Sequence, residues 1–333
     1  MTTTFTHHWQ VYGHDWAVAH LQQSMAYERI RHGYLIVGAE SVGKETLARQ
    51  FAMALNCTDP ERKPCGQCSA CRRIATGNHP DVLYTQRDSE TSPLKIEELR
   101  LMMQKLALKP FEARYRIAVF RDFDTAQPRA QDALLKTLEE PAPHAILILL
   151  AKSLEPVLPT ITSRSQVIHL RPAAVQTVYE TLTELFNADE DRARLLAHLS
   201  AGRMGWAINA LNNEEVLGQR AGAFDLLINI LGMTRVERFK QSDDLSKDKA
   251  ALITLLELWL SFWRDVFLLA ENSGLEPTNI DQAAALDQLK DRMSGEEAAT
   301  AVSTTRKTIG LLTDTNANAR LALDVLLLDY PGI

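Results

Sequence analysis

The sequence predicts an α/β domain, with a parallel sheet covered by helices on both faces, followed by a region made only of helices. Up to residue 171, short apolar runs typical of buried strands alternate with segments of helical periodicity. Beyond Pro172 the apolar runs end, and only helical patterns continue. This change of pattern divides the chain into an α/β part and a helical part.

Each strand of the α/β part is predicted from an apolar run next to polar or turn-forming residues. The runs predicted as strands are 34–37, 82–84, 116–120, 145–151 and 166–170. Helical spacing of apolar side chains predicts helices at 14–30, 46–55, 96–106 and 127–140. Pro110 and Pro141 end the last two patterns, because proline lacks the N–H group that a continuing helix needs.

The helical part contains six patterns of helical periodicity, at 174–187, 189–200, 203–211, 214–232, 250–271 and 295–328. The polar stretch 234–249 is predicted as a loop or linker. Apolar side chains cover a broad face of the 250–271 helix, including Trp259 and Trp263. So broad a face indicates burial on more than one side, either inside a helical bundle or against a neighbouring subunit.

The composition is that of an ordinary globular protein, with 333 residues and a net charge of −6. The 36 basic and 42 acidic side chains argue against a chain that binds nucleic acid by itself, because a nucleic-acid-binding protein needs a basic face to neutralise the phosphates. The first eight residues lack the apolar core of a signal peptide, and charges interrupt the most apolar window, 251–270. We therefore expect a soluble cytoplasmic protein.

The first predicted strand leads into a sequence typical of a phosphate-binding loop, Gly38-Ala-Glu-Ser-Val-Gly43-Lys44-Glu45-Thr46. Glycines let the backbone turn its N–H groups toward phosphate oxygens, and the helix N-terminus and the lysine add positive charge. The residue after the lysine is normally Ser or Thr, whose hydroxyl holds Mg²⁺. Here it is a glutamate, and the nearest hydroxyl group belongs to Thr46, one position further along the sequence. We expect a loop inherited from an ATPase but damaged for catalysis, without productive ATP binding.

All four cysteines lie within fifteen positions, at Cys57, Cys65, Cys68 and Cys71. Thiolates two residues apart can turn onto one ion, and four of them satisfy tetrahedral Zn²⁺. We therefore expect a structural zinc knuckle at 57–71, with disulfides or free thiols as the alternative. His79 lies close by in the sequence, and we expect it to face solvent rather than to bind the metal.

A resemblance to a known family rests on Leu134-Leu-Lys-Thr-Leu-Glu-Glu-Pro141 and on Thr162-Ser-Arg164-Ser165. These segments resemble the signatures of bacterial clamp-loader subunits, AAA+ proteins that open and close the replicative sliding clamp. The resemblance covers residues 10–210 and, more weakly, the segment that begins at Asn316. It implies a RecA-like AAA+ domain at 1–171, which includes the zinc knuckle, a helical lid at 172–211 and a helical collar for oligomerisation at 212–333.

Three positions depart from the ATP-hydrolysing members of this family. Glu45 replaces the magnesium-binding hydroxyl residue, Arg121 stands at the magnesium-binding aspartate position, and Gly205 stands where a phosphate-sensing arginine is expected. Asp122 occupies the position of the catalytic glutamate. Together the departures indicate a member that does not hydrolyse ATP, and the alternative is an active motor subunit in which Glu45 or Asp122 takes over metal coordination.

By the same resemblance, Arg164 would act as an arginine finger, reaching across a subunit boundary to the nucleotide of a neighbour. Without the motif, a surface ion pair is the simpler interpretation of this arginine. The partners that the resemblance implies are motor subunits of the gamma/tau type and the delta subunit in a five-membered ring, with the sliding clamp and primer–template DNA reached through the assembly. A third interpretation is a zinc-containing phosphate-loop scaffold unrelated to replication.

Overall fold

The computed structural model of the chain describes residues 9–86 and 93–332; the N-terminal octapeptide used for the signal-peptide argument lies outside them. The chain divides into two compact units, one formed by Met1–Thr181 with Gly202–Trp206 and the other by Leu182–Ala201 with Ala207–Ile333. Within the described residues, every helix falls short of the length and apolarity that crossing a membrane requires.

The first unit is built on a parallel sheet of five strands in the order β2-β3-β4-β1-β5. The strands are β1 Gly33–Val37, β2 Val82–Tyr84, β3 Arg116–Phe120, β4 Ala145–Ala151 and β5 Gln166–His169. Every residue of β1 and β4 is buried. This confirms the predicted sheet, with each strand within one residue of the expected bounds.

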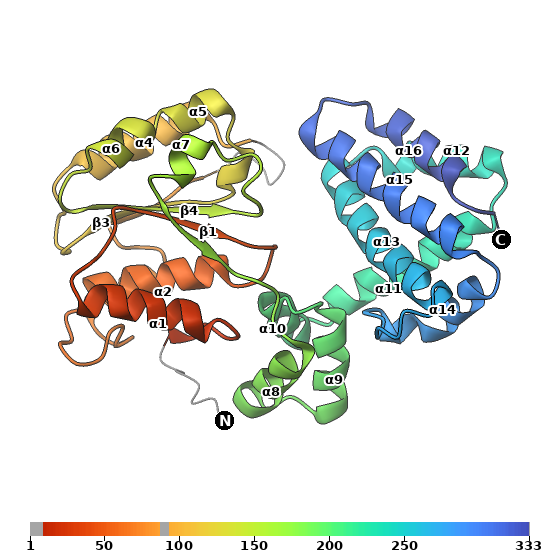
Figure 1. The fold of residues 1–333 in the computed structure, drawn as a ribbon, viewed down its shortest axis with the longest axis horizontal. Helices are drawn as coiled ribbons and strands as arrows, with labels where there is room; N and C mark the ends of the chain where they lie inside the picture. The colour runs from red at the N-terminus through yellow and green to blue at the C-terminus, as the bar shows by residue number, and fades with distance from the viewer. Residues whose placement is uncertain (1–8, 87–92, 333) are drawn as a thin grey trace. The chain divides into compact units, whose positions relative to one another are not determined.

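Helices cover both faces of this sheet (Figure 1). The elements between the strands, in chain order, are α1 Asp15–Ala26, α2 Lys44–Asn56, α3 Ser69–Ala75, α4 Ile96–Ala107, η2 Phe123–Thr125, α5 Pro128–Asp132, α6 Leu135–Glu139 and α7 Pro159–Thr162. One core lies between α1, α2 and the sheet, and a second lies between the sheet and α4 to α7.

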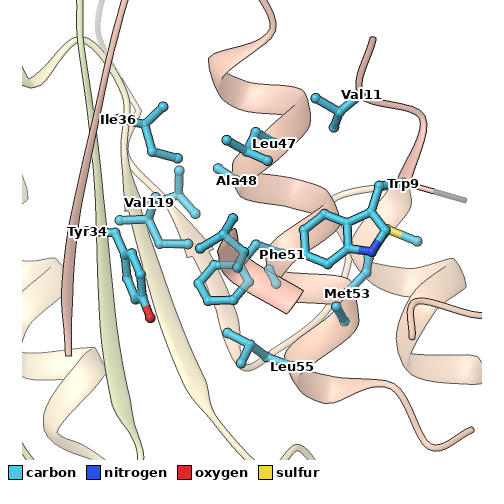
Figure 2. Packing of buried hydrophobic residues seen from close by; sticks show 14 of the residues in the cluster. Trp9, Val11, Tyr34, Ile36, Leu47, Ala48, Phe51, Met53, Leu55 and Val119 are labelled. Atoms are coloured by element: carbon cyan, nitrogen blue, oxygen red, sulfur yellow. The ribbon is translucent and has the colours of Figure 1, made fainter. Parts of the chain in front are cut away.

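The first of these cores is centred on Phe51 of α2 (Figure 2). Its ring meets Tyr34 of β1 edge-on, with ring centroids 4.9 Å apart, and stacks against Trp9 at 6.4 Å. Trp9 also donates its indole N–H to the carbonyl of Lys63, 3.2 Å away. The N-terminal segment is therefore fixed both to α2 and to the loop that carries the cysteines.

The helix predicted over 127–140 is instead two short helices, α5 and α6. Ala133 and Leu134 donate to carbonyls three residues back, which tightens the chain and breaks the i→i−4 pattern. The buried amide of Gln131 holds this region in place, since it donates to the carbonyls of Ala126 and Pro156.

The remaining helices are α8 Val175–Phe186, α9 Glu190–Leu199, α10 Met204–Asn212, α11 Glu215–Leu231, α12 Arg235–Leu245, α13 Lys249–Ala270, α14 Ala283–Lys290, α15 Gly295–Asp314 and α16 Ala319–Asp329, with η3 Ile280–Gln282. In the second unit, α13 packs against α11, α14 and α15. Its side chains Trp259, Phe262 and Trp263 are fully buried, so the broad apolar face belongs to a bundle core.

Two predictions for the helical part were wrong. The 295–328 pattern is two helices, because Thr315 is extended and the side chain of Asn318 caps α16 by accepting from the N–H of Leu321. The predicted loop 234–249 contains α12, which begins with a capping box between Thr234 and Glu237.

Helix α12 was missed because it packs through a buried arginine rather than through an apolar face. The guanidinium of Arg238 donates to the carbonyls of Leu231 and of three C-terminal residues, at distances of 2.7 to 3.0 Å; these three are Leu327, Tyr330 and Pro331. The side chain therefore joins the ends of α11 and α16, whose last carbonyls have no partner within their own helices.

Replacing Arg238 with methionine is expected to destabilise the second unit by about 3 kcal/mol, because four carbonyls lose a charged donor in a buried place. Chemical denaturation followed by circular dichroism measures the change. Arg235→Met, an exposed position on the same helix, is the control and should change the stability by less than about 0.5 kcal/mol. Equal effects of the two substitutions would contradict this account.

Candidate functional site

The predicted phosphate-binding loop connects the end of β1 to the start of α2, at the carboxyl edge of the sheet. The N–H of Gly38 donates to the carbonyl of Ala151, 3.1 Å away, and a Cβ at Gly38 would lie 2.4 Å from the carbonyl oxygen of Leu170. Gly43 precedes α2 with a φ of +110°, which glycine adopts without strain. The glycines therefore stand where the tight turn needs them.

The side chain of Lys44 is turned onto its own loop. Its Nζ donates to the carbonyls of Gly38, at 2.6 Å, and Ala39, at 2.8 Å. Burial lowers the pKa of Lys44, and the negative charge of Asp124 partly opposes this. Thr46 lies in the first turn of α2 and is partly buried. The two hydrogen bonds of Lys44 occupy two of the three N–H donors of its ammonium group.

Two of the departures from an ATPase contact each other. Glu45 Oε1 lies 2.5 Å from Arg121 Nη2, so the side chains predicted at the hydroxyl position and at the metal-binding aspartate position form an ion pair. The guanidinium of Arg121 also lies over the ring of Tyr84, 4.8 Å from its centroid. Sequence reasoning missed Tyr84, although β2 and β3 are neighbours whose carboxyl ends meet at this edge.

The third departure, Gly205, packs directly against the phosphate-binding loop. Its N–H donates to the carbonyl of Ser41, 2.7 Å away, and a Cβ at this glycine would lie 2.9 Å from the same oxygen. Gly202, with a φ of +78°, is equally confined, because a Cβ there would lie 2.3 Å from the carbonyl of Ala173. This backbone has no room for the arginine that ATP-hydrolysing relatives were expected to carry at Gly205.

These residues do not fit a magnesium ion. The carboxylate of Glu45 is already paired with a guanidinium, which repels a divalent cation. Asp122, at the predicted catalytic glutamate position, precedes η2 in a left-handed conformation, with a φ of +47°. Burial raises the pKa of Asp124, and the negative charge of Asp122 acts in the same direction. The geometry retains a glycine turn for phosphate but lacks an open metal position among these groups.

Arg164 lies in the segment that follows α7, and 38% of its side chain is exposed to solvent. Its Nη2 lies 2.7 Å from Glu139 Oε1 at the end of α6, and its Nη1 donates to the carbonyl of Thr160, 3.1 Å away. Glu139 was not singled out in the sequence as a partner of this arginine. The guanidinium is thus accessible from solvent while it is held by two neighbouring elements.

The four cysteines converge on one point beside α2. Their Sγ atoms, from Cys57, Cys65, Cys68 and Cys71, all lie within 4.8 Å of one another. A tetrahedral zinc ion with Zn–S distances of about 2.3 Å needs sulfurs about 3.8 Å apart, so the four thiols fit this ion after small shifts. The cysteines are not joined by disulfides.

The surroundings of the sulfurs also favour a cation. Burial opposes ionisation, but N–H groups of Thr58 and Cys71 donate to Cys68 and lower its pKa to about 6. Burial raises the pKa of Cys71, so this thiol needs a nearby positive charge to ionise. His79 is buried rather than exposed, which corrects the expectation for it; its Nδ1 accepts from the N–H of Asp81 at 3.1 Å.

Comparisons with known proteins identify similar chains. A family model described as "DNA polymerase III, delta subunit" matches residues 13–174. The chain is 30% identical to DNA polymerase III subunit tau/gamma of Haemophilus influenzae over 67% of this chain and 33% of that protein. It is 31% identical to subunit tau of Escherichia coli over 60% and 31%, and 27% identical to subunit delta' of Bacillus subtilis over 74% and 74%. The chain thus spans about a third of the tau-type relatives.

The solved structures that match this chain show low overall similarity to it. A clamp loader delta protein of Bacillus subtilis aligns with 93% of this chain and 98% of its own, at a TM-score of 0.36 and 14% identity. A DNA polymerase III gamma subunit-related protein of Thermotoga maritima aligns with 92% and 97%, at a TM-score of 0.39 and 15% identity.

Proposed function

The chain belongs to the AAA+ family of DNA polymerase III clamp-loader subunits, and from this premise we propose that it is a delta-prime-type subunit that does not hydrolyse ATP. In this role its Arg164 reaches into the ATP site of an adjacent motor subunit of the gamma/tau type. Its other partners are a delta subunit, in a ring of five subunits, and through the ring the sliding clamp and primed DNA.

The observation that carries this proposal is the ion pair between Glu45 and Arg121. Phosphoryl transfer in this class of protein needs Mg²⁺ held by a hydroxyl and an aspartate beside the terminal phosphates. In this chain the side chains at the two corresponding positions, Glu45 and Arg121, form an ion pair with Oε1 and Nη2 2.5 Å apart. Binding of Mg²⁺ would require breaking this pair and placing the ion next to a guanidinium, which is electrostatically unfavourable.

Two further observations support the loss of ATPase activity. Two of the three N–H donors of the Lys44 ammonium are bound to carbonyls of its own loop, so the lysine is turned toward the loop rather than held ready for a phosphate. The backbone at Gly205 closes on Ser41 and leaves no space for a sensing arginine. Both observations fit a chain that does not respond to a terminal phosphate.

The exposed guanidinium of Arg164 supports its proposed role as a finger. Negative charge spreads over the transferred phosphoryl oxygens in the transition state, and an arginine supplied by a neighbour stabilises that charge. The contacts of Arg164 lie within its own unit, with Glu139, Thr160 and Ser163, and its side chain is partly open to solvent. A half-exposed ion pair of this kind is weak enough to be exchanged for a phosphate.

We assign the four cysteines to a structural zinc ion, because four thiolates leave no position open for catalysis. The three-part division into a RecA-like domain at 1–171, a lid at 172–211 and a collar at 212–333 remains part of the proposal. A cytoplasmic location follows from the proposed role in replication.

The ATPase activity of the purified chain tests the proposal. We expect Mg²⁺-dependent turnover no higher than that of the Lys44→Ala variant, because the metal position is filled by an ion pair. A coupled phosphate-release assay at saturating ATP measures both proteins. Clear turnover that is lost in Lys44→Ala would instead favour the alternative, an ATP-hydrolysing motor subunit of the gamma/tau type.

A further inference from the structure

The guanidinium of Arg164 is held at two different nitrogens by two different elements. Glu139 of α6 lies 2.7 Å from Nη2, and the carbonyl of Thr160 in α7 accepts from Nη1 at 3.1 Å. Contacts at both terminal nitrogens fix the plane of the group as well as its position. Nη1 also has a longer contact with Ser163 Oγ, at 3.5 Å. A guanidinium has five N–H donors, so these three contacts leave donors for a further acceptor.

The closeness of α6 to the arginine segment depends on Gly33 at the start of β1. A Cβ at this glycine would lie 2.7 Å from Cδ2 of Leu138 and 3.4 Å from the carbonyl oxygen of Arg164. Leu138 is buried and directly precedes Glu139 in α6. The α6 segment and the Arg164 segment therefore both pack against Gly33, which has no side chain. This packing brings Glu139 close to Arg164, so their contact does not depend only on two long surface side chains.

We propose that Glu139 is a positioning residue for Arg164, an inference that rests on the proposed finger role. The carboxylate keeps the guanidinium oriented while its remaining donors face the neighbour's phosphates. Since 51% of the Glu139 side chain and 38% of the Arg164 side chain are exposed, water screens the pair. The bond orients the arginine without binding it so tightly that a phosphate cannot share it.

Single and double substitutions in the reconstituted loader test this role through ATP hydrolysis. Glu139→Ala is expected to lower kcat by about two- to fivefold with little change in KM, since a screened ion pair is weak and orientation matters in the transition state. Glu139→Gln should be intermediate, because its amide oxygen still accepts a hydrogen bond. Glu140→Ala, at the exposed next position, is the matched control and should leave kcat unchanged.

The double variant Glu139→Ala/Arg164→Ala separates positioning from a structural role. We expect it to match Arg164→Ala alone, because a positioning residue has no effect once its target is gone. A further slowing in the double variant would overturn the proposal, as would a normal kcat for Glu139→Ala in a loader that Arg164→Ala slows. If Arg164→Ala itself leaves kcat unchanged, the finger role fails, and the positioning role fails with it.

Discussion

Replacing Arg164 with alanine is expected to slow ATP hydrolysis at the neighbouring site by about 10³-fold or more, because the transition state loses a guanidinium supplied from outside the subunit. Single-turnover hydrolysis by the reconstituted assembly measures this step apart from product release. Arg164→Lys should recover only part of the rate, since an ammonium keeps the charge but not the planar set of donors. The variant chain itself should fold normally, because the arginine is partly exposed.

The control for this experiment is Arg129→Ala, an exposed arginine on α5 in the same unit. Both variants should enter the assembly in the same amount, as measured by size-exclusion chromatography with light scattering. Unchanged hydrolysis by an assembly that contains Arg164→Ala would remove the finger role. Equal slowing by the two variants would point to a general effect of surface charge instead.

Replacing Cys71 with serine is expected to abolish metal binding and to destabilise the first unit by about 4 kcal/mol or more, the range in which loss of a structural metal falls. Cys71 is fully buried, and its Sγ contacts the carbonyl of Met53 in α2, so the metal loop and the core of the unit are joined at this residue. Elemental analysis should find about one zinc ion per wild-type chain and none in the variant.

Ser69→Ala is the matched control, because this exposed serine lies between two cysteines and offers no thiol. It should keep its zinc and its thermal stability. Addition of a strong chelator to the wild-type protein should lower the unfolding temperature to that of Cys71→Ser, since both treatments remove the same ion. A wild-type chain that contains no metal and does not respond to the chelator would contradict the structural zinc site.

The parallel sheet of the first unit could be read directly from the chain. A strand buried on both faces must be apolar at every position, and the runs at 34–37 and 145–151 satisfy this condition. The glycine turn after β1 and the clustering of the four cysteines were also predicted, because both depend on residues close together in sequence. Each of these features depends on residues that are neighbours in sequence, so the sequence alone was enough to predict it.

The helices of the second unit were predicted only where an apolar stripe marks them. Helix α13 has such a stripe, whereas α12 packs through Arg238 and shows no apolar period. Its capping box, Thr234 and Glu237, was the available signal for a helix start. Burial of a polar side chain depends on which carbonyls the fold places around it, and these come from residues about ninety positions away.

From the sequence, the resemblance to clamp-loader subunits predicted which groups an ATPase of this kind would need and that three of them are replaced, at Glu45, Arg121 and Gly205. Only the tertiary structure decided that the first two form an ion pair, that the third closes on Ser41, and that Glu139 holds Arg164. The physical reason is distance along the chain: these contacts join residues 25 to 164 positions apart. Their meeting depends on strand order and packing rather than on any local preference of the backbone.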